Sequence, residues 1–162
     1  MFNRLFKTDQ SHQQKALEFY QECIEQARRA KFYTEMGVPD SFDGRFEMIV
    51  LHVCLKIMEL QTLEENTTKI EQAMFDIMFA DMDQSLRERG IGDHSFPKHM
   101  KRMMKGFNGR AHAYKQALDG KDKTALKDAL RRNVYGTLKD DKIETQKMDL
   151  LVGYVEGRYK RG

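Results

Sequence analysis

The sequence predicts an all-α fold, a single-domain bundle of about six helices. The chain has 162 residues, and only two of them are prolines. Its 11 glycines fall mostly at the ends of apolar-periodic segments, and runs of β-branched residues are few. A chain of this length can bury one core without disulfides or metals. We therefore expect residues 1–162 to form one domain, with residues 1–10 flexible.

Hydrophobic periodicity places three helices in the first half of the chain. The first covers 11–32, where apolar residues recur every three or four positions: Leu17, Tyr20, Cys23, Ile24 and Ala27. A loop rich in turn residues follows at 33–44. The second helix, 44–63, is apolar nearly all the way round; a buried strand also fits, but its length favours a central helix. The third covers 67–89, with Asn66 as its N-cap and Gly90 as its stop.

Three more helices are expected in the second half. The fourth opens at residues 95–97, since proline suits a first helical turn, and it ends at Gly120. Its apolar stripe lies opposite a basic stripe made of Lys98, Lys101, Lys105, His112 and Lys115. A shorter fifth helix covers 121–136 and a last amphipathic helix covers about 140–160.

The charges are divided unevenly along the chain. Residues 1–86 carry 9 basic and 15 acidic side chains, a net charge of −6, whereas residues 87–162 carry 19 and 10, a net charge of +9. Such a division indicates either an anionic partner, such as RNA, a ribosome or lipid headgroups, or two halves that attract each other. No apolar run approaches the ~18–20 residues that span a bilayer, and no signal peptide is evident. The two cysteines are expected to be buried free thiols.

The segment 75–93, FDIMFADMDQSLRERGIGD, combines aspartates with phenylalanines and methionines. Asp81, Asp83 and Ser85 match the first ligands of an EF-hand loop. However, Leu86 replaces the turn glycine and Gly92 replaces the bidentate glutamate, so a calcium site is excluded. On a helix, Phe75, Phe79, Met82 and Leu86 share an apolar face, whereas Asp76, Asp83 and Arg87 share a polar one. Asp83 lies four residues before Arg87, the spacing of a helical ion pair.

No pattern in the sequence supports catalysis. The histidines lack metal-ligand spacing, and no nucleophile elbow, P-loop or dinucleotide fingerprint is present. His52 is more simply a satisfied polar group on the second helix than a ligand or base. We therefore expect a protein that is not an enzyme, with no catalytic residue, metal, cofactor or small-molecule substrate.

Two binding surfaces are suggested by composition. The basic stripe, of which Lys98, Lys101, Lys105 and Lys115 are the lysines, would suit RNA or phosphate, although charged helix faces are usually just solvated. The 11 methionines would suit an adaptable apolar surface for a client protein. Most of them, including Met48, Met58, Met74 and Met78, would equally fill the core.

Three segments carry a resemblance to a known family. They are FYTEMGVPDSFDGRFEMIVLHVCL (32–55), MFDIMFADMDQSLRERGIGDHSFPKHMKRM (74–103) and FNGRAHAY (107–114). In order and spacing, over about 30–120, they resemble the ubiquinol–cytochrome c chaperone family, in its bacterial members and in the related mitochondrial assembly factors. The segments 1–15 and 120–162 carry little of the likeness.

The resemblance implies a helical chaperone that is not an enzyme and assists assembly of ubiquinol–cytochrome c reductase, respiratory complex III. The expected partner is cytochrome b or another subunit of that complex. The resemblance also implies a ribosome contact, and the basic N-terminal MFNRLFK would suit the membrane surface. A bacterial protein is expected to be cytoplasmic, or peripheral at the inner membrane, and a mitochondrial one would need a targeting extension. The matching positions, taken as a partner-facing or scaffold motif, are Asp43, Gly44, Arg45, Phe46, His52, Asp76, Asp81, Asp83, Arg87, Glu88, Gly92, Asp93, Gly109, Arg110 and Tyr114.

Overall fold

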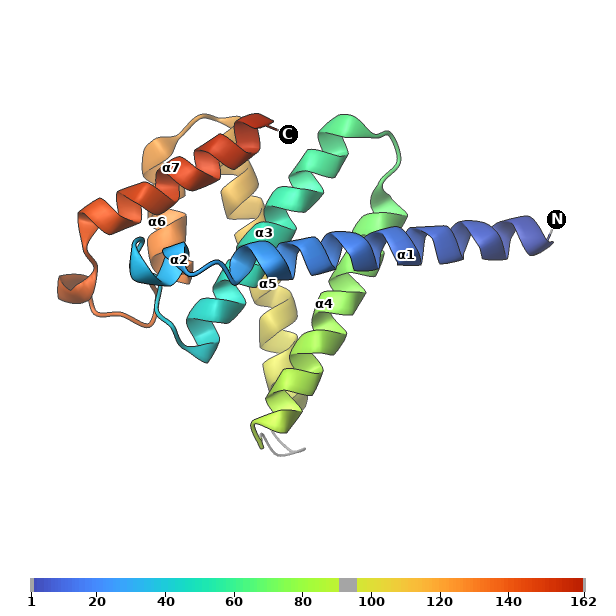
Figure 1. Cartoon of the computed structure of the whole chain (residues 1–162), viewed down its shortest axis with the longest axis horizontal. Coiled ribbons are helices and arrows are strands. Elements are labelled where there is room, and N and C mark those ends of the chain that lie inside the picture. Colours follow the sequence, from blue (N-terminus) through green and yellow to red (C-terminus); the bar gives the residue numbers. More distant parts are fainter. Residues whose placement is uncertain (1, 91–95, 162) are drawn as a thin grey trace.

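Helices make up most of the described chain (Figure 1). The computed structural model describes residues 2–90 and 96–161, and the side chains of 10–90, 101–102 and 105–160. Within these ranges the elements are α1 (Phe2–Ala27), α2 (Lys31–Thr34), α3 (Phe42–Leu63), α4 (Thr68–Glu88), α5 (Phe96–Asp119), α6 (Lys123–Asn133), a 3-10 turn (Asp140–Lys142) and α7 (Thr145–Arg161). Six of these helices exceed two turns, which confirms the predicted all-α bundle.

Helix α3 lies at the centre of the fold and contacts α1, α5 and α7. Its side chains Val50, Leu51 and Val53 are fully buried, as expected for a helix that is apolar all round. Helix α1 lies across both α3 and α4 and extends beyond them toward the N-terminus (Figure 1). Helix α6 packs between α5 and α7 on the other side of α3. The core is therefore continuous from α1 to α7.

The predicted first helix, 11–32, is wrong at both ends. Helix α1 begins at Phe2 and ends at Ala27, and a short non-helical link separates it from the single turn of α2. The break lets Phe32 turn inward, where it is fully buried, and the Tyr33 hydroxyl donates a hydrogen bond to the Ala27 carbonyl, 2.9 Å away. Leu17, expected in the apolar stripe, is 38% exposed, because Ala16 occupies the buried position instead. The flexibility expected of residues 1–10 stays a prediction.

The ends of the later helices also differ from expectation. Thr67 is the N-cap of α4, not Asn66, which adopts a left-handed φ of +61° just before it. Gly90, with φ of +77°, follows the C-cap of α4 as predicted. Helix α6 is shorter than the predicted 121–136, because Asp122 caps it by accepting a hydrogen bond from the Ala125 amide, 3.0 Å away. The last predicted helix divides into the 3-10 turn and α7.

Gly44, in the first turn of α3, has no room for a side chain. A Cβ at this position would lie 1.9 Å from the Pro39 carbonyl oxygen. We expect Gly44→Ala to destabilise the fold by roughly 3 kcal/mol or more, because the overlap is with the backbone at Pro39, which would have to move to relieve it. Thermal unfolding measures the loss.

Gly109 provides the matched control for that substitution. It lies within α5, is exposed, and a Cβ there would meet no atom within 4 Å. Gly109→Ala is therefore expected to stabilise the fold by about 0.5–1 kcal/mol through helix propensity. Equal melting temperatures for the two variants would contradict the close contact at Gly44.

Candidate functional site

An open groove of about 770 Å³ lies between the C-terminal end of α1, α2, the N-terminal end of α3 and the C-terminal half of α4. In Figure 1, the N-terminal end of α3 and the C-terminal half of α4 lie on the same side of α1, and both segments line the groove. Its apolar lining comprises Ile24, Phe42, Phe46, Ile49 and Met82, among others. A groove of this volume is large enough to hold a small molecule or part of a helix.

Three arginines line the same groove. The Arg45 guanidinium lies 2.6 Å from a carboxylate oxygen of Asp40, an exposed pair that holds the pKa of Asp40 below its usual range. The Arg89 guanidinium lies over the Phe42 ring, 4.4 Å from its centroid. The Arg28 side chain makes no hydrogen bond or ion pair within the described part of the chain. The groove thus combines an apolar floor with cationic walls.

One wall of the groove is fixed by a hydrogen bond between α1 and α4. The Tyr20 hydroxyl donates to Asp81, 2.5 Å away, and Tyr20 is 5% exposed. Burial, followed by the bond to the Asp81 carboxylate, raises the pKa of Tyr20 well above its ordinary value. Asp81 is therefore a structural acceptor that sets the crossing of the two helices.

Replacing Tyr20 with Phe tests this role of Asp81. The variant keeps the ring and removes the hydroxyl, so we expect a loss of about 1.5 kcal/mol in the free energy of unfolding, the usual value for a bond to a charged acceptor. Asp81→Asn, which keeps an acceptor oxygen, should lose less. Chemical denaturation measures both, and a larger loss for Asp81→Asn than for Tyr20→Phe would oppose the assignment.

A buried ion pair joins α3 to α5. Arg110 donates three hydrogen bonds to the Glu47 carboxylate, from Nε to Oε2 at 2.8 Å, from Nε to Oε1 at 3.1 Å and from Nη2 to Oε1. The Glu47 side chain is 9% exposed. Burial raises the pKa of Glu47, and the hydrogen bond to Arg110 acts against that rise. The pair holds two helices in register and lies outside the groove lining.

His52 joins α3 to α7 in the core and is fully buried. Its Nδ1 lies 2.7 Å from the Met48 carbonyl oxygen and its Nε2 lies 2.7 Å from the Tyr154 hydroxyl. Because a carbonyl oxygen can only accept, Nδ1 carries the proton and Nε2 accepts from Tyr154. Burial lowers the pKa of His52 to about 4. The prediction of a satisfied polar group is confirmed.

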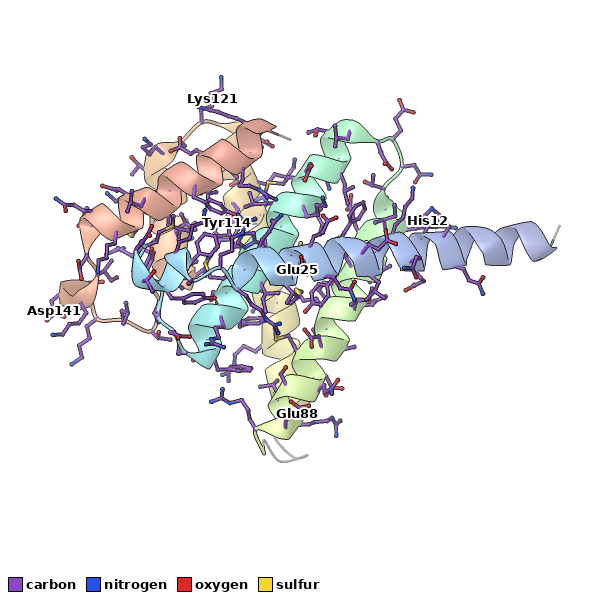
Figure 2. All side chains as sticks on the ribbon, viewed as in Figure 1. His12, Glu25, Glu88, Tyr114, Lys121 and Asp141 are labelled. Carbon is purple, nitrogen blue, oxygen red and sulfur yellow. The ribbon has the colours of Figure 1, made fainter. Side chains whose placement is uncertain are left out.

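The structure divides the expected motif residues among several places. Arg45, Phe46 and Asp81 line the groove. His52, Arg110 and Tyr114 belong to the interior, and Figure 2 shows Tyr114 among the central side chains, fully buried. Asp83 and Arg87 form the expected ion pair at 2.9 Å on the outer face of α4, whose end carries exposed Glu88 (Figure 2). The remaining positions are exposed Asp43, Asp76 and Gly109, buried Gly44, and Gly92 and Asp93, which lie outside the described residues.

The described part of the basic stripe expected on the fourth helix is exposed on α5, whereas most of the methionines expected to offer an apolar surface are buried. Lys101, Lys105, His112 and Lys115 are exposed along α5, and Lys115 pairs with Asp119 at 3.2 Å. The side chain of Lys98 lies outside the described set. Met48, Met58, Met74 and Met78 are buried, so these methionines fill the core. Of the methionines whose side chains are described, only Met82 lines the groove, and it is 3% exposed.

Sequence reasoning missed the residues that complete these contacts: Tyr20 as a donor, Glu47 and Tyr154. The sequence does indicate a buried carboxylate at Glu47, since it is a lone acid inside the apolar run FEMIVLHV. A buried acid requires a cation, and Arg110 lies 63 residues away. Tyr154 carried no such signal, because a tyrosine on an amphipathic helix is ordinary.

No group of three or more His, Cys, Asp or Glu side chains among the described residues is placed to hold a metal ion. No helix in residues 2–90 or 96–161 combines the length and apolar character needed to cross a bilayer.

The fold is a helical bundle with an open, partly apolar groove beside the N-terminal end of its central helix α3. The sequence pattern of the ubiquinol–cytochrome c chaperone family matches residues 34–159, most of the chain. The chain therefore belongs to the ubiquinol–cytochrome c chaperone family. The match continues through α6 and α7, beyond the segment 30–120 in which the likeness was expected.

Two kinds of relatives agree with this assignment. The crystal structure of the Cbp3 homolog from Brucella abortus is similar, with 35% identity and a TM-score of 0.79 over 96% of this chain and 84% of that one. The ubiquinol–cytochrome c reductase complex assembly factor 1 of Mus musculus is 24% identical over 86% of this chain and 46% of its own length, and that of Xenopus laevis is 25% identical over 86% and 68%. The chain thus spans about half the length of the mouse relative.

Proposed function

We propose that this chain is a chaperone without enzymatic activity that assists the assembly of ubiquinol–cytochrome c reductase by holding cytochrome b, or another subunit, in the groove. The observation that carries the proposal is the open groove with an apolar floor in a member of this family. The names of the curated relatives, assembly factors of that reductase complex, support it.

The physical need for such a groove follows from the client. Membrane helices expose apolar side chains until they pack against one another, and in water those surfaces aggregate. A helix-in-groove contact shelters one apolar face without requiring a catalytic residue. Arg45 and Phe46 would contact the client directly, whereas His52, Arg110 and Tyr114 would keep the groove-forming helices in place. The proposed location is the cytoplasm, with transient contact at the inner membrane surface.

Deleting the gene in a strain that depends on this reductase tests the proposal. The assembled complex and its b-type haem absorbance are expected to fall, and expression of the intact chain should restore both. Crosslinking with mass spectrometry in the same cells should join groove residues such as Phe46 to a reductase subunit. Unchanged reductase in the deletion strain would refute the assembly role.

The exposed lysines of α5 favour a second candidate, a module that binds RNA or the ribosome. Phosphate contacts weaken steeply with salt, whereas an apolar groove does not. A salt titration of binding to purified ribosomes separates the two functions. If Lys101→Glu/Lys105→Glu abolishes a steep salt-dependent binding, the ribosome contact is supported, and salt-insensitive or absent binding excludes it.

A further inference from the structure

We propose that the groove selects an apolar helical segment that carries acidic side chains, rather than apolar segments in general. The proposal deepens the assembly role and rests on it, since it specifies which client segment the groove accepts. The observation behind it is the charge of the walls around an apolar floor.

The cations outnumber the acids along the lining. Arg28, Arg45 and Arg89 line the groove, against Asp40 and Asp81. Both acids are already engaged within the chain, Asp40 with Arg45 and Asp81 with the Tyr20 hydroxyl. Neither Arg28 nor Arg89 has a carboxylate partner within the described residues. Two guanidinium groups therefore face the groove without an anion of their own.

The positions of these two arginines favour carboxylates on a helix over a single phosphate. The Tyr20–Asp81 hydrogen bond joins α1 to α4. Arg28 and Arg89 lie just past the ends of these helices, each eight residues beyond its helix's member of that bond, about 12 Å along the helix direction at 1.5 Å per residue. The two axes diverge (Figure 1), so the arginines reach the groove from separate walls. Carboxylates spaced along a helix match two such cations better than one headgroup does.

The floor between the arginines requires the rest of the segment to be apolar. Ile24, Ile49 and Met82 line the groove together with the rings of Phe42 and Phe46. A polar helix would bury unpaired groups against these side chains and lose affinity. A basic helix would bring like charges to Arg28 and Arg89, which discriminates against it. The expected ligand is an amphipathic helix with an apolar face and glutamate or aspartate at its edges.

Two synthetic helical peptides test the selection. Both are 18 residues long and rich in Leu and Ala, and they differ only in carrying Glu or Lys at the polar positions. Fluorescence anisotropy with the full chain is expected to show the Glu peptide binding at least about tenfold more tightly. Raising the salt concentration should narrow this difference, because the rim charges are solvent-exposed. Equal affinity for the two peptides overturns the proposal.

Variants of Arg28 and Arg89 test whether the preference for the Glu peptide arises at the groove. Arg28→Gln/Arg89→Gln is expected to weaken the Glu peptide about tenfold and to leave the Lys peptide unchanged or slightly tighter. The control is Arg132→Gln, which removes an exposed cation from the end of α6, outside the groove lining. Circular dichroism and thermal unfolding establish that each variant is folded. If Arg132→Gln weakens binding of the Glu peptide as much as the double variant does, or if the double variant does not weaken it, the Glu peptide does not bind at the groove arginines.

Vesicles that contain anionic phospholipid provide the competing ligand. If they bind in a way that depends on Arg28 and Arg89 while the Glu peptide does not, the groove recognises lipid and the proposal is wrong. A deletion strain that carries the double variant separates this inference from the assembly role. Normal reductase with the double variant, beside depleted reductase in the deletion strain, would defeat the charge selection and leave the assembly function standing.

Discussion

Replacing Arg110 with Met is expected to destabilise the fold by roughly 3–5 kcal/mol at pH 7.5. Methionine keeps most of the aliphatic volume, so the loss comes from the Glu47 carboxylate, which remains 9% exposed between α3 and α5 without its cation. An unpaired buried charge is far more costly than the net contribution of the intact pair. Guanidinium denaturation of both proteins measures the difference.

The pH dependence and a double variant separate this cause from simple loss of packing. Without Arg110 the pKa of Glu47 rises further above its ordinary value, so the penalty should shrink as the pH falls and the carboxyl becomes neutral. Glu47→Gln/Arg110→Met should recover most of the stability, since no buried charge remains. A penalty that is the same at pH 5 and pH 8, or one that persists in the double variant, would point to packing instead.

The parts of the fold that could be predicted from sequence are those with local causes. The continuous apolar run of α3 predicted a central helix, and Val50, Leu51 and Val53 are fully buried there. Gly90 marked the end of α4 because a left-handed residue is needed after the C-cap. The Asp83–Arg87 pair followed from its four-residue spacing. Each of these depends on neighbours within one or two helical turns.

The parts that could not be predicted depend on contacts between distant segments. The break after Ala27 exists because Phe32 turns inward to pack against the rings of His52 and Tyr154, with centroids 5.5 and 4.8 Å away. The Arg110–Glu47 pair and the His52–Tyr154 bond join residues 63 and 102 positions apart. Periodicity carries no information on such pairs. The groove has the same origin, since four separate segments supply its lining.

The buried polar contacts also explain why the groove can stay open. Tyr20–Asp81 fixes α1 on α4, and the two bonds from α3 fix it on α5 and α7. Each bond is directional and satisfied, so alternative packings of these helices would leave buried polar groups unpaired. Two of these three contacts, Glu47–Arg110 and His52–Tyr154, lie outside the groove lining, so the helices around the groove are held partly from outside it.

Acidification should destabilise the fold through His52. Its pKa is about 4 in the folded protein and about 6.5 when unfolded, so the unfolded chain binds the proton more readily. The stability from keeping His52 neutral is fully present above pH 6.5 and is lost as the pH falls toward 4. We expect a loss of about 2 kcal/mol between pH 7.5 and pH 5, and about 3 kcal/mol once both states are protonated.

The physical cause of this loss is the environment of the imidazole. Burial is the largest contribution to the lowered pKa, and the nearby cations Arg158, Arg29 and Lys31 lower it further, whereas the bond to the Met48 carbonyl opposes the shift. Protonation also removes the Nε2 acceptor that the Tyr154 hydroxyl uses. The charged form would have to reverse that bond, with Nε2–H donating to the Tyr154 hydroxyl, and its buried position deprives it of hydration.

His52→Gln isolates the contribution of this residue. Glutamine does not titrate, and every other titratable group is common to both proteins, so the difference between their unfolding free energies at pH 7.5 and pH 5 reports His52. The variant should start less stable at pH 7.5 and lose about 2 kcal/mol less on acidification. Parallel pH profiles for the two proteins would contradict the prediction, because they would show that folding leaves the pKa of His52 at its unfolded value of about 6.5.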